Sequence, residues 1–201
     1  MPRRPILILA VAVLVAAAAL AAFAFLGLPQ QNGTGTGRAL VGGPFSLTDH
    51  TGRRVTEKDF LGRYMLVFFG YTYCPDVCPT ELQVMTAALD ELKEAGDAIV
   101  PVFITVDPER DTPDTVRAYV ENFSPRLVGL SGTLEEIAAV AKAYRVYYAR
   151  SGEGKSEDYL MDHSSIIYLM GPDGTLVRHF GYTTDARQLA AELKDAITGS
   201  S

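Results

Sequence analysis

The stretch YMLVFFGYTYCPDVCPTEL, residues 64–82, decides the fold, because it joins a strand pattern to a helix pattern through a loop that holds both cysteines of the chain. Tyr64 to Gly70 is almost continuously apolar and has the length of a strand, which predicts a central strand buried on both faces. Pro79 is expected to open a helix that ends near Gly96, with an apolar stripe of Leu82, Met85, Leu89 and Leu92. The stretch therefore predicts a strand–loop–helix unit with the cysteines at its turn.

Strand and helix patterns alternate on both sides of this unit. Before it, residues 45–55 predict a short hairpin. After it, the patterns predict strands over 99–106, 127–130, 164–170 and 176–180, an extended segment over 146–148, and helices that begin at Thr112-Pro113 and span 133–144 and 185–197. Strands that alternate with helices and end in a hairpin and a helix predict an α/β sandwich around a mixed sheet.

The uncharged apolar run Ile6–Leu28 predicts one transmembrane helix that anchors the chain in a lipid bilayer. As a helix it would extend roughly 35 Å, enough for a hydrocarbon core of about 30 Å. Arg3 and Arg4 precede the run and the next basic residue is Arg38, so the positive-inside rule places everything after the run on the far side of the membrane. A cleaved signal peptide, with Ala22-Phe23-Ala24 as its cleavage site, is the alternative.

These patterns divide the chain into an N-terminal anchor (1–28), a flexible Gly-containing linker (29–39) and a main domain (40–198). The few residues before the apolar run leave no room for a mitochondrial presequence. We therefore expect a single-pass protein of the bacterial inner (cytoplasmic) membrane, with the domain on its extracytoplasmic side. The net charge of −6 argues against nucleic acid as a partner, because nucleic-acid binders need a basic surface.

Cys74 and Cys78 are expected at the carboxyl end of a central strand and the start of a helix. Helix N-termini carry unpaired N–H groups and partial positive charge, which lower the pKa of a thiol and favour the thiolate. The thiolate is both a metal ligand and a redox nucleophile. The alternative is an inert or disulfide-bonded pair, but closing so short a loop stabilises by only about 2 kcal/mol. The placement therefore indicates chemistry at the cysteines.

His163 is the candidate third group, because it begins the predicted strand over 164–170. If that strand runs antiparallel to Tyr64–Gly70, as in thioredoxin-like sheets, its first residue faces Cys74 and Cys78 across the top of the sheet. Two thiolates and an imidazole suit copper(I), copper(II) or zinc.

Three segments in this order resemble the Sco/SenC family: FFGYTYCPDVCPTEL (68–82), TVDPERDTP (105–113) and YLMDHSSIIYLMGPDG (159–174). The resemblance covers most of residues 40–197. It implies a membrane-anchored protein with a thioredoxin-like fold, in which Cys74, Cys78 and His163 bind one copper ion as copper(I) or copper(II).

The same resemblance implies a metallochaperone that receives copper from a donor protein and delivers it to the copper A centre of cytochrome c oxidase subunit II during oxidase assembly. The alternative is a thiol–disulfide oxidoreductase, in which Cys74 and Cys78 would be catalytic, keep the cysteines of subunit II reduced and depend on a thiol reductant. The sequence favours the chaperone. Thioredoxin-like redox enzymes usually have Cys-x-x-Cys opposite a cis-proline, whereas here the cysteines lie one residue further apart and Asp162-His163 stands opposite.

The chain departs from the family pattern at Tyr73, where many members have a histidine, so we expect no auxiliary ligand there. His50 and His179 lie outside the matching segments and are interpreted as a turn residue and a surface residue. Asp76 and Asp162 neighbour the proposed ligands and are candidates to orient them or to tune copper affinity. The segment over 107–113 is interpreted as turn and helix-cap chemistry, with a charged docking rim as the alternative.

Overall fold

The computed structural model describes residues 41–151 and 159–199. The predicted anchor and linker lie outside these residues. Within the described ranges, no helix is long and apolar enough to cross a membrane.

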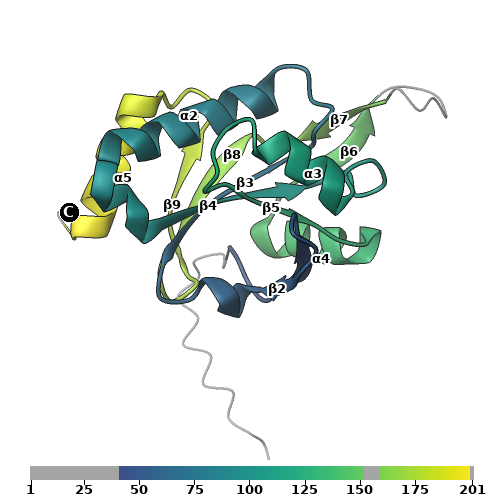
Figure 1. Ribbon diagram of the computed structural model, residues 1–201, viewed down its shortest axis with the longest axis horizontal. Helices are drawn as coiled ribbons and strands as arrows, with labels where there is room; N and C mark the ends of the chain where they lie inside the picture. Colours follow the sequence, from purple (N-terminus) through teal and green to yellow (C-terminus); the bar gives the residue numbers. More distant parts are fainter. Residues whose placement is uncertain (1–40, 152–158, 200–201) are drawn as a thin grey trace, which may run out of the picture. The chain divides into compact units, whose positions relative to one another are not determined.

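A seven-stranded mixed sheet forms the centre of the domain (Figure 1). Its strands lie in the order β2 (Arg54–Thr56), β1 (Ser46–Asp49), β5 (Val128–Ser131), β4 (Ile99–Thr105), β3 (Tyr64–Gly70), β8 (Ile166–Met170) and β9 (Leu176–Gly181). β3 pairs in parallel with β4 and antiparallel with β8, and the second pairing is the one assumed when His163 was expected to face the cysteines. The nearly continuous apolar sequences of β3 and β4 fit this central position, because both faces of these strands are covered.

Helices cover both faces of the sheet. α2 (Val77–Leu92), α3 (Pro113–Val120) and α5 (Ala186–Thr198) lie on one face, and α4 (Leu134–Tyr144) lies on the other (Figure 1). Two short 3-10 helices, η1 (Glu57–Phe60) and η2 (Lys93–Ala98), precede β3 and β4. On the α4 face, the Phe69 ring packs against the Tyr144 ring, with 5.2 Å between the ring centroids. This architecture confirms the predicted thioredoxin-like α/β sandwich.

Three of the helix starts follow the capping residues in the sequence. The side chains of Thr112, Thr133 and Asp185 each accept a hydrogen bond from a backbone N–H of the first turn of α3, α4 and α5. α2 differs from the prediction, because it begins at Val77 rather than at Pro79. Pro79 is tolerated there, since the first turn of a helix has no intrahelical acceptor for its N–H groups. Cys78 therefore belongs to the first turn of α2.

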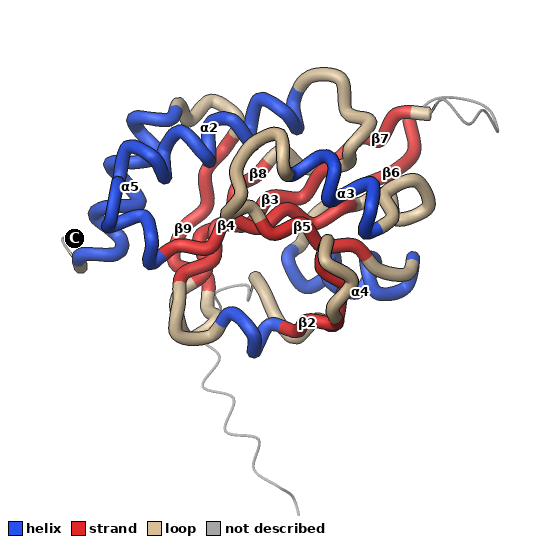
Figure 2. Tube along the Cα trace, in the orientation of Figure 1, coloured by secondary structure: helices blue, strands red, loops and turns tan. Residues whose placement is uncertain are grey.

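The prediction that His163 begins a strand of the main sheet is wrong. His163 does not begin a strand of the main sheet but ends β7 (Leu160–His163), which pairs antiparallel with β6 (Tyr148–Ser151) in a separate two-stranded sheet. Figure 2 shows these two strands apart from the seven-stranded sheet. We call β6, β7 and the flanking residues Tyr147, Tyr159 and Ser164 the arm.

The break between β7 and β8 has a local cause. Ser164 donates its N–H to the carbonyl of Tyr147 (3.0 Å), and its hydroxyl accepts the Tyr147 N–H (3.1 Å). The chain thus continues the pairing of the arm one residue past His163, and β8 starts only at Ile166. The sequence pattern missed the break because the apolar residues of β7 and β8 follow one another closely.

Candidate metal centre

The two cysteines lie where β3 ends and α2 begins. Cys74 is half-buried in the loop, and Cys78 is fully buried in the first turn of α2. The Cys78 N–H points at the Cys74 sulfur, 3.4 Å away. Gly70, the last residue of β3, makes room for this arrangement, because a Cβ at that position would lie 2.8 Å from the Cys78 sulfur. The geometry of the loop therefore depends on a glycine, and no pattern in the sequence marks this requirement.

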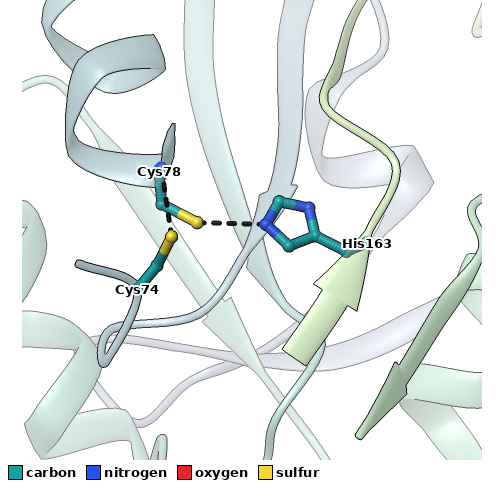
Figure 3. A group of neighbouring side chains, drawn as sticks. All are labelled: Cys74, Cys78 and His163. Atoms are coloured by element: carbon teal, nitrogen blue, oxygen red, sulfur yellow. Dashed lines mark hydrogen bonds between the residues drawn. The ribbon is translucent and has the colours of Figure 1, made fainter. Parts of the chain in front are cut away.

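His163 reaches the same place from the arm. Its Nε2 lies 3.2 Å from the Cys78 Sγ, and the ligand atoms of Cys74, Cys78 and His163 all lie within 4.8 Å of one another (Figure 3). The three residues predicted from the sequence thus converge. The prediction that His163 faces the cysteines is confirmed, although a different strand carries it.

Two aromatic rings and one carbonyl orient the imidazole. The rings of Phe68 and Tyr71 meet the His163 ring edge-on, at centroid distances of 6.0 and 5.9 Å. Its Nδ1 lies 3.3 Å from the carbonyl oxygen of Ser164. A carbonyl can only accept, so this contact fits a proton on Nδ1, and an imidazole in that tautomer can offer its Nε2 lone pair to a cation held by the sulfurs.

The thiols differ sharply in acidity. Hydrogen bonding from the Cys78 side chain, followed by that from His163, holds the pKa of Cys74 well below its ordinary value. The same contact with Cys74, together with burial, raises the pKa of Cys78. In the metal-free protein the pair therefore carries one thiolate, on the more exposed cysteine. Binding a cation to both sulfurs requires Cys78 to lose its proton as well.

A buried carboxylate ties the cysteine loop to the neighbouring strand. Asp111 accepts hydrogen bonds from the N–H and hydroxyl of Thr72 (2.9 and 2.5 Å) and from the hydroxyl of Thr105 at the end of β4 (2.6 Å). Burial raises the pKa of Asp111. The interpretation of this segment as cap chemistry is confirmed at Thr112, but it missed Asp111. The sequence did offer one signal for Asp111, because an acidic residue that soon follows β4 lies at the same edge of the sheet as the end of β3.

The carboxylates next to the ligands do not orient the imidazole. Asp76 and Asp162 are exposed, and the Nδ1 of His163 faces the Ser164 carbonyl instead of a carboxylate. The side chain of Tyr73 is 60% exposed, and the Arg110 guanidinium lies over its ring.

The other two histidines take no part in the site. The Nδ1 of His50 accepts the N–H of Gly129 (3.0 Å), next to the β1–β2 turn, and His179 is exposed on β9. Both interpretations from the sequence are confirmed.

The family model described as SCO1/SenC matches residues 33–198. Among curated proteins, the mitochondrial SCO1 homolog of Homo sapiens is 50% identical over 159 residues, which cover 78% of this chain and 53% of that protein. The chain thus spans about half the length of this relative.

Solved structures give the same relationship. The copper-bound ScoI of Arabidopsis thaliana is 47% identical with a TM-score of 0.75, and the match covers 79% of this chain and 99% of that one. The copper-bound ScoI of Bradyrhizobium japonicum is also 47% identical, with a TM-score of 0.72 and coverage of 78% and 99%. Relatives of this chain therefore occur in both mitochondria and bacteria.

Proposed function

This chain belongs to the SCO1/SenC family, and on that premise we propose that it binds one copper ion through Cys74, Cys78 and His163. The observation that supports this most directly is the convergence of two sulfurs and one imidazole nitrogen within 4.8 Å. Soft thiolate ligands favour copper(I), and an imidazole suits either copper oxidation state. The copper bound to ScoI of Arabidopsis and Bradyrhizobium agrees with this choice of metal.

The site also suits a protein that gives up its metal. Cys74 is half-buried, so a thiolate of another protein can approach a cation held there. Transfer would proceed by exchange of ligands, with one incoming thiolate for each thiolate that leaves. We infer that the recipient is the copper A centre of cytochrome c oxidase subunit II and that a separate donor protein loads the site.

We propose that the chain performs this function while anchored in a membrane. A helix over Ile6–Leu28 would tether domain 40–198 by linker 29–39 to the bilayer that holds the oxidase. We propose the bacterial inner membrane, with the domain on the extracytoplasmic side. The bacterial relative from Bradyrhizobium japonicum is compatible with this setting, and the positive-inside rule supports the orientation.

The copper function is tested by titration of the fully reduced full chain with copper(I) against a competing chelator, and separately with zinc. We expect one copper(I) per chain, held far more tightly than zinc, and no specific copper(I) binding by the Cys74–Cys78 disulfide form. Equal affinity of the reduced and oxidised forms would exclude the two sulfurs as ligands and refute the proposal.

The pKa values of the two cysteines support a second function, reduction of a disulfide. A half-exposed thiolate at Cys74 can attack a disulfide, and the buried thiol of Cys78 can then resolve the mixed disulfide. The dithiol becomes a disulfide while the substrate disulfide becomes two thiols, and a separate thiol reductant restores the starting state. Reduction of an oxidised subunit II peptide by the metal-free protein, lost in Cys74→Ser, would establish this activity. A rate no faster than that of glutathione would exclude it.

A further inference from the structure

The arm that carries His163 lies outside the main sheet, so side-chain contacts hold it to the domain. Met161 of β7 packs in the core, and a group of polar contacts lies at Tyr159, directly before β7. Its hydroxyl donates to the Asp107 carboxylate (2.6 Å), and its carbonyl accepts a hydrogen bond from the Arg110 guanidinium (2.9 Å). The same guanidinium lies over the Tyr159 ring, 3.6 Å from its centroid. The start of β7 is thus bound to the loop after β4.

Arg110 also contacts the cysteine loop. Its guanidinium carbon lies 4.7 Å from the centroid of the Tyr73 ring, and Tyr73 directly precedes Cys74. The next residue, Asp111, holds Thr72 of the same loop through two hydrogen bonds. One side chain therefore contacts both the peptide that carries the first cysteine and the arm that carries the histidine.

The position of Arg110 is itself fixed. Its Nε donates to the Asp107 carboxylate at 2.5 Å, and this carboxylate is almost fully buried. On the outer side of Tyr159, Arg150 of β6 lies 4.1 Å from the ring centroid and pairs with Glu109. Tyr73, Arg110, Tyr159 and Arg150 thus form a series of alternating aromatic and cationic side chains next to the ligands.

We propose that Arg110 is a positioning residue, which fixes His163 relative to Cys74 and Cys78 by linking Tyr159 of the arm to Tyr73 of the cysteine loop. The proposal deepens the proposed copper function, on which it rests, by adding a residue that determines how firmly the histidine holds the ion. It also gives a role to the charged segment over 107–113. From the sequence, this segment was interpreted as turn and helix-cap chemistry, with a charged docking rim as the alternative.

A lysine at this position would keep the charge but not the contacts. The planar guanidinium can stack on two rings and donate to Asp107 and Tyr159 at once, whereas an ammonium is a compact, strongly hydrated point charge. Arg110→Lys therefore removes the link while leaving a cation beside the buried Asp107, so the domain is expected to fold. Loss of a residue that orients a metal ligand lowers metal affinity by about 10- to 100-fold.

The first test measures copper(I) affinity of the reduced full chain in a double-mutant cycle. We expect Arg110→Lys to weaken binding by about 10-fold or more and His163→Ala to weaken it similarly. The double variant should bind like His163→Ala alone, because Arg110 acts through His163. Unchanged affinity in Arg110→Lys, or additive losses in the double variant, would overturn the proposal while leaving the copper site in place.

The matched control is Arg126→Lys at the opposite end of the strands. Arg126 also makes several contacts, to the carbonyls of Gly96 (2.6 Å) and Ile99 (3.1 Å) and to Asp97. Its replacement should affect stability but not copper affinity. An equal loss of copper in both variants would attribute the effect to general destabilisation and overturn the proposal.

A second readout needs no metal. The chain has three histidines, so their imidazole NMR signals are readily assigned. The Phe68 and Tyr71 rings should shift the His163 signals, and Arg110→Lys should move these signals towards their unfolded values without moving those of His50 and His179. Unmoved His163 signals would overturn the proposal. Moved signals in a protein that binds no copper would refute the copper function and leave Arg110 as the residue that positions the imidazole.

Discussion

The two halves of the candidate site are built in different ways. Cys74 and Cys78 belong to one continuous strand–loop–helix unit, whose strand lies at the centre of the sheet. His163 lies 85 residues after Cys78, on an arm that pairs with no strand of the main sheet. The sulfur donors are therefore fixed by the central strand and its helix, whereas the imidazole donor is carried by an arm that side-chain contacts, including the buried Met161, hold to the domain.

This difference suits a protein that must both bind and release a cation. Under the proposed function, a rigid pair of sulfurs would provide most of the affinity, and an imidazole that depends on a few contacts would be lost first when another protein supplies a thiolate. We therefore expect changes in the cysteine half to affect stability and copper affinity together. Changes in the arm should affect copper affinity with little effect on stability.

The largest expected effect is the loss of a thiolate. Cys78→Ser should lower copper(I) affinity by roughly a thousandfold, because one of two soft ligands is replaced by a hydroxyl with little affinity for copper(I). Competition titration of the reduced full chain measures this loss. Retained affinity would show that the sulfurs do not provide most of the copper affinity. The contrast between the sulfur donors and the imidazole donor would then fail.

His163→Ala should have a smaller effect, a loss of about 10- to 100-fold in copper(I) affinity. The free energy of unfolding of the metal-free protein should change by less than about 1 kcal/mol, because the ring is only half-buried. Urea unfolding and copper titration of the same samples separate the two quantities. A large loss of stability would show that the imidazole is needed for the packing around Phe68 and Tyr71.

Gly70→Ala tests whether a change beside the cysteines lowers the free energy of unfolding and the copper affinity together. The new methyl group would lie 2.8 Å from the Cys78 sulfur and 3.0 Å from the rings of Phe68 and Phe103. We expect the free energy of unfolding to fall by about 2 kcal/mol and copper affinity to fall with it. Gly181→Ala is the control, because no atom lies within 4 Å of the added Cβ. Equal effects of the two substitutions would contradict the close packing at Gly70.

The smallest effect concerns a buried carboxyl on α2. Glu81 is 1% exposed, its Oε2 has no hydrogen-bond partner among the described residues, and burial raises the pKa of the carboxyl from 4.5 to about 7. Between these two values the folded state holds a proton that the unfolded state has lost. The free energy of unfolding therefore falls as the pH rises through this window and is lowest above pH 7.

Glu81→Gln should abolish this penalty. In the reduced, metal-free protein the substitution should raise the free energy of unfolding by about 1 kcal/mol at pH 8 and change it little at pH 5. Urea unfolding at the two pH values provides the measurement. Glu91→Gln, at an exposed position of the same helix, should have almost no effect at either pH. A pH-independent difference between wild type and Glu81→Gln would show that the carboxyl does not titrate in this range.

The sequence alone predicted the parts of the molecule that depend on near neighbours in the chain. Tyr64–Gly70 formed the predicted strand, because its residues are almost continuously apolar, and Thr133 and Asp185 cap the predicted helices. The four-residue spacing of the cysteines placed both sulfurs at one turn. These outcomes follow from propensities and hydrogen bonds within a few residues, which a sequence shows directly.

Only the tertiary structure decided how the imidazole reaches the sulfurs. Neither the arm, nor the Ser164–Tyr147 pairing that ends it, nor the contacts of Arg110 with Tyr73 and Tyr159 could be inferred from local patterns. The close approach of Cys78 to Gly70 was equally invisible. The physical reason is that these contacts join segments far apart in the chain. Their geometry depends on how the sheet brings those segments together, and no local periodicity records it.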